Sequence, residues 1–204
     1  MEKQTGRLEA FSDGIFGVAI TLLAIEIGIK EYAGATNLNL WHRILALWPE
    51  YFTYFNSFAT ILLVWIGHQK IIERLRLTNH WVVMLNGLVL LLVVLFPYPT
   101  KMVGTFIGTE AQETAVAFYA GFTGTISVAL LLLNVAIVKN PRLLVNAKLD
   151  IPWFHNMIRG QIIAVATYAF AAALAFFSSY AALAITFLMW VFWTIATRDG
   201  NKSD

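Results

Sequence analysis

Polar side chains able to carry chemistry interrupt three apolar stretches of the sequence. Ser12 and Asp13 open the first stretch. Trp65 and His68 lie near the end of the second, and Asn86 follows soon after the start of the third. If neighbouring stretches are antiparallel helices, all five side chains share one depth. A carboxyl group at membrane depth is costly without a partner, so this layer marks a functional or an architectural site.

Two interpretations of this layer follow from its chemistry. Hydrogen bonds among Ser12, Asp13, His68 and possibly Asn86, with the indole N–H of Trp65 as a further donor, would remove the cost of burying each group separately. That interpretation assigns the layer to architecture, and the sequence favours it. The alternative makes Asp13 or His68 a proton relay or a pH sensor, because histidine titrates near neutrality.

Enzymatic and metal-dependent functions are poorly supported by the sequence. Walker-type loops, dinucleotide fingerprints, His-Glu-x-x-His and Gly-x-Ser-x-Gly motifs do not occur. The plausible nucleophile and base at membrane depth are Ser12, Asp13 and His68, which fit a structural cluster better. The histidines show no spacing typical of a metal triad, and the chain has no cysteine. We expect no enzyme, no resident metal and no cofactor.

The composition identifies an integral membrane protein. Hydrophobic residues make up 59% of the 204 positions and charged residues 13%, and the apolar residues come in long runs. Such segments should be helices, because backbone groups in lipid must satisfy one another. We therefore predict a single all-α domain over residues 1–204 with six transmembrane helices. Hydropathy places them at roughly 8–29, 48–69, 81–101, 114–138, 157–177 and 180–197.

The distribution of cations predicts the orientation of these helices. With a cytoplasmic N-terminus, nearly all lysines and arginines fall in cytoplasmic segments, and only Lys30, Arg43 and Lys101 fall outside. An even number of helices then places the C-terminus in the cytoplasm too. The mild basicity thus reflects orientation, and we expect no nucleic-acid partner.

The connectors between the predicted helices are short. We expect loops at about 30–47 and 102–113, and a cytoplasmic interfacial segment at 139–156 that contains Pro141, Pro152 and Trp153. Only a tight turn around Ser178 and Ser179 separates the last two helices.

Three motifs resemble those of a known family. Arg7, Phe11, Ser12 and Asp13 form Arg-x-x-x-Phe-Ser-Asp, which resembles the signature of the transmembrane protein 175 family, potassium channels of lysosomes and prokaryotic membranes. Two further motifs are similar: Trp-x-x-His at Trp65 and His68, and Pro-aromatic-Pro-Thr at 97–100. The resemblance covers the first three helices; the last three contribute hydropathy alone.

The resemblance implies a homotetrameric potassium channel in a prokaryotic plasma membrane, surrounded by lipid, with permeant monovalent cations as its ligands. On a helical wheel, Arg7, Phe11, Gly14, Val18, Leu22, Ile25 and Ile29 form one stripe; Thr21 lies about 60° from Val18, and Asp13 about 140° away. Such a stripe is also typical of ordinary helix packing. By resemblance, Val18, Leu22 and Ile25 are the pore constriction and Thr21 contributes to potassium selectivity.

The remaining polar residues then form a structural network, and rival functions remain open. We assign to that network Arg7, Phe11, Ser12, Asp13, Trp65, His68 and Asn86. No TVGYG filter occurs, so selectivity must come from side chains. A secondary transporter is the main alternative; we expect Pro97 and Pro99 at a helix end, which disfavours the broken helices typical of transporters. A membrane scaffold or receptor subunit is a third.

Overall fold

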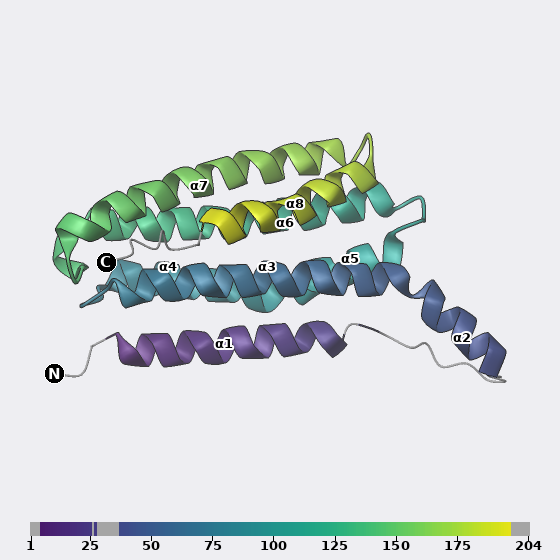
Figure 1. The fold of residues 1–204 in the computed structure, drawn as a ribbon, viewed down its shortest axis with the longest axis horizontal. Coiled ribbons are helices and arrows are strands. Elements are labelled where there is room, and N and C mark those ends of the chain that lie inside the picture. The colour runs from purple at the N-terminus through teal and green to yellow at the C-terminus, as the bar shows by residue number, and fades with distance from the viewer. Residues whose placement is uncertain (1–4, 26, 28–36, 197–204) are drawn as a thin grey trace.

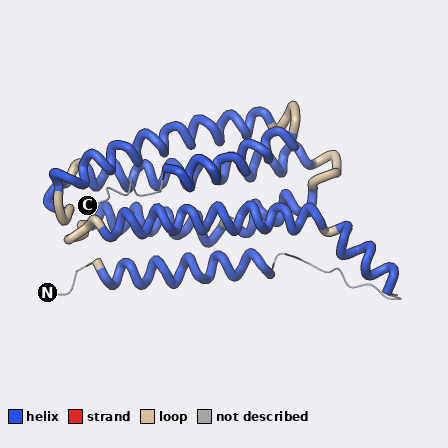
Figure 2. Tube along the Cα trace, in the orientation of Figure 1, coloured by secondary structure: helices blue, strands red, loops and turns tan. Residues whose placement is uncertain are grey.

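The computed structural model describes residues 5–25, 27 and 37–196 of the chain. Its described part is an elongated bundle of helices, with α1 along one face and α7 and α8 at the opposite face (Figure 1). No strand occurs in the described ranges (Figure 2). The helices are α1 (Gly6–Ile25), α2 (Asn37–Ala46), α3 (Trp48–Glu73), α4 (His80–Leu95), α5 (Pro97–Phe106), α6 (Gln112–Val138), α7 (Ala147–Leu174) and α8 (Ser179–Ala196).

Several of these helices suit a membrane. Four described stretches are long and apolar enough to cross it, namely α1, α4 continued by α5, α6 and α7. The all-α fold and the multi-pass membrane character are therefore confirmed. Helices α3 and α8 coincide with the two other predicted segments, but α8 is shorter, and α3 carries polar side chains that it buries inside the bundle. Six crossings per subunit stay a prediction.

The core is centred on α6, which packs against α4, α5, α7 and α8. Its buried residues lie on several sides of the helix and include Tyr119, Ile126, Leu133 and Ile137. Helix α1 packs mainly on α3 and α4. It contributes Phe16, Ala19 and Leu23 to the core and is attached to the bundle by one side only.

Two predicted connectors contain helix. Residues 37–46 form α2, whose mixed composition a hydropathy search overlooks. Helix α7 begins at Ala147, so it starts ten residues before the predicted helix at 157, and the interfacial location of this segment stays a prediction. Asn146 caps the helix, because its side-chain oxygen accepts from Leu149 N–H at 3.4 Å while Asp150 Oδ2 accepts from Asn146 N–H at 2.9 Å. Pro152 is tolerated near this end, where its missing N–H removes a single helical bond.

The prolines after α4 break a helix but do not end the apolar segment. Helix α4 ends at Leu95, so the prolines lie at a helix end as expected, but α5 starts at Pro97 and continues the segment to Phe106. Proline suits the first position of a helix because it needs no donor there. Thr100 Oγ1 donates to the carbonyl of Phe96 at 2.9 Å and so satisfies one acceptor at the break.

Two loops at one end of the bundle contact each other. Leu75 and Leu144 form an antiparallel β-bridge between the α3–α4 and α6–α7 connections. The Arg74 guanidinium lies 3.9 Å from the ring centroid of Trp153, and its Nε lies 3.9 Å from Asp150 Oδ1. At the opposite end of the bundle, α7 ends at Leu174 and α8 begins at Ser179, so the predicted tight turn is confirmed.

Candidate pore face and its supporting polar cluster

Helix α1 presents two different faces. One face is buried against the bundle by Ser12, Phe16, Ala19 and Leu23. On the opposite face Val18 is 53% exposed and Ile25 is 74% exposed. The subunit therefore leaves an apolar helix face uncovered, which at a membrane protein's surface must meet lipid or another subunit.

The exposed face contains most of the sequence-predicted stripe. Arg7, Phe11 and Gly14 are exposed, and Leu22 is half-buried. Ile29 lies outside the described residues. Val18, Leu22 and Ile25 thus stand on or beside one uncovered face at spacings of four and three residues, that is, about one helical turn apart.

Thr21 lies beside this stripe and is exposed. Its hydroxyl donates to the carbonyl of Val18 at 2.8 Å. Because the hydroxyl proton is used in this bond, the lone pairs of the oxygen point away from the helix backbone. They can accept a hydrogen bond or contact a cation there. Thr21 is the polar group that interrupts an otherwise apolar surface between Val18 and Ile25.

Asn86 of α4 joins α1 to α3 through its buried amide. Its Oδ1 lies 2.6 Å from His68 Nε2, so this ring nitrogen is the donor. Its Nδ2 donates to Ser12 Oγ at 3.1 Å, and Ser12 Oγ donates to the carbonyl of Leu8 at 2.8 Å. All three polar side chains are buried, and Phe16 packs on the imidazole with ring centroids 5.3 Å apart.

Asp13 lies in a second branch of the same layer. The indole N–H of Trp65 donates to Asp13 Oδ1 at 2.8 Å. Gln69 Nε2 lies 3.5 Å from the same oxygen, a long contact that sequence reasoning missed. Gln69 was detectable, because it follows His68 directly and so lies one turn after Trp65 on the same helix.

The structure places two of the seven predicted network residues elsewhere. Arg7 and Phe11 lie on the exposed face of α1, whereas the other five meet in the layer between α1, α3 and α4. Only these five, Ser12, Asp13, Trp65, His68 and Asn86, are called the polar cluster below.

A further buried polar group has no counterpart in the sequence-based prediction. Asn56 Nδ2 donates to the Tyr119 hydroxyl at 2.9 Å and approaches Thr186 Oγ1 at 3.2 Å. Ser57 Oγ lies 2.7 Å from Thr100 Oγ1 and 3.2 Å from the Tyr119 hydroxyl. These contacts link α3 to α5, α6 and α8. The adjacent polar pair Asn56–Ser57 inside an apolar stretch was the available signal.

The chemistry of the polar cluster suits hydrogen bonding better than proton transfer. The path from His68 to Ser12 passes through the Asn86 amide, which has no readily exchangeable proton to relay, and it ends at a backbone carbonyl. Across the described residues, no group of three or more His, Cys, Asp or Glu side chains is placed to hold a metal ion.

Comparison with known proteins links these features to a channel family. Residues 7–97 match the sequence profile described as "Endosomal/lysosomal potassium channel TMEM175". A protein of Chamaesiphon minutus named as a potassium channel is 38% identical over 120 residues, covering 59% of each chain. A Chryseobacterium protein named as a potassium channel is 26% identical over 198 residues, covering 97% of this chain and 96% of that one.

A solved structure resembles the whole fold. The crystal structure of a lysosomal potassium-selective channel TMEM175 homolog from Chamaesiphon minutus matches with a TM-score of 0.87 and 28% identity. The match covers 97% of this chain and 100% of that one. By sequence, the chain spans about three fifths of the length of the Chamaesiphon relative it matches. The fold similarity therefore includes α6 to α8, which hydropathy alone had predicted.

Proposed function

The chain belongs to the TMEM175 family, and from this premise we propose that it forms a membrane channel that conducts potassium in preference to sodium. The observation that carries the proposal is the uncovered apolar face of α1, with Thr21 beside it. Four subunits arranged around an axis would bring four such faces together and enclose a passage.

In this proposal Val18, Leu22 and Ile25 form successive apolar rings. An ion that enters such a constriction loses hydration and gains no ligand, so a narrow ring gates by dewetting. Thr21 supplies hydroxyl oxygens between the rings, and its bond to Val18 holds each oxygen in place. Selectivity for potassium then rests on side chains.

The assembly and its setting are part of the same proposal. We assign the protein to a prokaryotic plasma membrane as a homotetramer of six-helix subunits with both termini in the cytoplasm. The relatives of Chamaesiphon and Chryseobacterium named as potassium channels support the channel function, and the orientation rests on the distribution of lysines and arginines. The role of the chain is transport and not catalysis.

The polar cluster is assigned to architecture. It fixes α1 to α3 and α4 by side-chain hydrogen bonds, which add to the few apolar side chains that α1 buries in the core. These directional bonds help to set the face that α1 presents to the axis. The proton-relay alternative requires a transferable proton along the chain, and Asn86 provides none.

A secondary transporter stays the second candidate, because α4 and α5 form a broken helix. The break lies next to Thr100, which bonds to Ser57 of α3. Transporters use such breaks to bind substrate near the centre of the membrane. Here Ser57 and Thr100 bond to each other, whereas Asn56 Oδ1 in the same buried group has no partner among the described residues.

Reconstitution distinguishes the two functions. The purified protein is incorporated into planar bilayers, and currents are recorded under a potassium/sodium gradient. Unitary currents that reverse near the potassium potential support the proposal. Saturable flux at transporter-like turnover, without unitary currents, supports the second candidate.

Variants at the narrow ring test the pore assignment. Leu22→Ala enlarges the ring and Leu22→Asn makes it polar, so both should alter conductance or selectivity. Leu188→Ala on the exposed side of α8 is the matched control and should leave permeation unchanged. Correctly assembled Leu22 variants with wild-type permeation would show that the ring lies elsewhere.

A further inference from the structure

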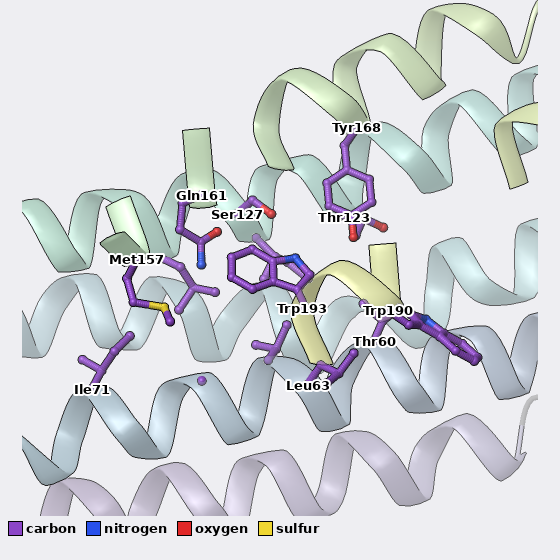
Figure 3. A pocket seen from close by; sticks show the side chains of 14 residues that line it. Thr60, Leu63, Ile71, Thr123, Ser127, Met157, Gln161, Tyr168, Trp190 and Trp193 are labelled. Atoms are coloured by element: carbon purple, nitrogen blue, oxygen red, sulfur yellow. Dashed lines mark hydrogen bonds between the residues drawn. The ribbon is translucent and has the colours of Figure 1, made fainter. Parts of the chain in front are cut away.

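A pocket lies between α3, α6, α7 and α8, on the far side of α3 from the candidate pore face (Figure 3). The cavity itself measures about 40 Å³, which is room for a few water molecules or one small polar head. An apolar chain attached to such a head would lie against the rim. The floor of the pocket is buried, with Ile126, Ser127 and Tyr168, whereas its rim at Leu63, Gly67 and Trp193 is half-exposed.

The pocket carries a buried polar side chain that is unsatisfied. Gln161 is 4% exposed, and its Oε1 has no hydrogen-bond partner among the described residues. Figure 3 shows its amide reaching from α7 into the space beside Trp193. Gln161 and Ser127 both occupy the middle of long apolar helices, where a bare amide oxygen is costly. An occupant that donates a hydrogen bond would remove this cost.

The lining defines the chemistry of that occupant. No lysine, arginine, aspartate or glutamate lines the pocket, so a charged head would have no counter-ion. Apolar and aromatic side chains such as Leu63, Val64 and Trp190 surround the polar end. A neutral molecule with one hydrogen-bonding head and one apolar chain matches this arrangement.

The route of access is from the membrane. The described part of α8 ends at Ala196, about halfway along α7 (Figure 1), and the rim of the pocket is half-exposed. Residues 197–204 read Thr-Arg-Asp-Gly-Asn-Lys-Ser-Asp, a hydrophilic sequence unsuited to an apolar pocket. Residues 197–204 are therefore a poor match for the occupant.

We propose that this pocket binds a neutral single-chain amphiphile from the bilayer, with its hydroxyl or amide head donating to Gln161 and its chain lying against Leu63 and the two tryptophans. The site is separate from the candidate pore face and does not depend on the channel proposal. Its occupant would link α7 and α8 to α3.

Tryptophan fluorescence provides the test, because Trp190 and Trp193 line the pocket and bromine quenches indole on contact. The full-length protein in lipid nanodiscs is titrated with a terminally brominated octanol, and in parallel with bromooctane, which lacks the hydroxyl. We expect saturable quenching by the alcohol that disappears in the Trp190→Phe/Trp193→Phe variant. Gln161→Leu should weaken alcohol binding roughly fivefold to tenfold and leave bromooctane unaffected.

A blocking variant supports the test if Gln161→Leu fails to fold. A Cβ added at Gly67 meets nothing within 4 Å, so Gly67→Leu projects into the pocket without a backbone clash and should abolish saturable quenching. Gly87→Leu is the matched control: Gly87 is exposed on α4, has equally open space and does not line the pocket. This control should bind like the unmodified protein.

Three results would overturn the proposal. The first is quenching that rises without saturation, as in simple partition into lipid. The second is equal binding of alcohol and bromooctane with no effect of Gln161→Leu. The third is quenching of Trp193 by phospholipids with brominated acyl chains that is as strong as by the alcohol and independent of Gln161, which would identify ordinary lipid tails as the occupant.

Discussion

Replacing Asn86 by leucine tests whether the polar cluster stabilises the fold by hydrogen bonding. The change keeps the branched shape of the side chain, enlarges it, and removes the bonds to His68 Nε2 at 2.6 Å and to Ser12 Oγ at 3.1 Å. The same enlargement occurs in the control variant below. Ser12 keeps its bond to Leu8, but the buried imidazole loses its acceptor. A buried donor left without a partner costs about 1–3 kcal/mol, so we expect the free energy of unfolding to fall by about 2 kcal/mol.

The chain provides an unusually well-matched control for this change. Asn134 of α6 is fully buried like Asn86, but neither its Oδ1 nor its Nδ2 has a hydrogen-bond partner among the described residues. Asn134→Leu therefore removes two unsatisfied polar atoms and no bond. Its effect should be neutral or stabilising, by about 1 kcal/mol.

The assay is reversible unfolding of the purified protein in mixed micelles with increasing denaturing detergent, followed by circular dichroism. A difference of about 2 kcal/mol between the two variants corresponds to roughly a 30-fold difference in the unfolding equilibrium constant. Ser12→Ala should cost less in the Asn86→Leu background than in the native one, because the shared bond is already absent. Equal destabilisation by Asn86→Leu and Asn134→Leu would refute the reasoning.

Three further predictions concern other described residues. Asp13→Ala should lower the free energy of unfolding by about 1–3 kcal/mol and reduce the yield of assembled protein, because the Trp65 indole loses its acceptor. Asp13→Asn should cost less and keep the ion preference. A stable Asp13→Asn protein with an altered pH response would instead favour a proton relay. Thr21→Val removes the hydroxyl and should lower the potassium/sodium permeability ratio about fivefold in bilayer recordings, whereas Thr21→Ser should retain the ratio. An unchanged ratio in Thr21→Val would exclude the hydroxyl from selectivity. Gly104→Val should destabilise the protein by about 1–3 kcal/mol, because an added Cβ lies 3.2 Å from Thr53 Oγ1 and 3.4 Å from Glu50 Cα. Gly87→Val is the control, because the space there is open, and equal stability of the two variants would contradict the prediction.

The two faces of α1 were predictable from the sequence because its packing is simple. A helix attached by one side obeys the 3.6-residue period, so Ser12 and Val18 point to opposite faces as expected. The depth of the polar cluster was also predictable, because a carboxylate at membrane depth needs hydrogen-bond donors and the sequence offers few donors at that depth. Arg7 and Phe11 were assigned to the network by their place in the motif, although the helical wheel puts them on the stripe with Val18, and they are exposed as that stripe predicts.

Helix boundaries were less predictable, for reasons visible at three sites. Pro97 lies at a helix end as expected, but proline equally starts a helix, and Thr100 satisfies the acceptor at the break. The first turns of α7 carry Lys148 and Asp150, which a hydropathy search counts as loop although they form a capped helix end. The Asn56–Tyr119 contact joins residues 63 positions apart, and no local pattern reveals such a pairing.

Modification of a single introduced cysteine at Val18 tests most directly whether the exposed face of α1 lines the pore. The chain has no native cysteine, so Val18→Cys carries one thiol, and Leu188→Cys on exposed α8 is the matched control. A cationic methanethiosulfonate reagent reacts with the thiolate, which forms in water and not in lipid. We predict that the reagent blocks potassium currents of Val18→Cys channels and leaves those of Leu188→Cys unchanged. Full currents through Val18→Cys channels after the reagent, in a protein that mass spectrometry shows to be unmodified, would contradict the pore assignment.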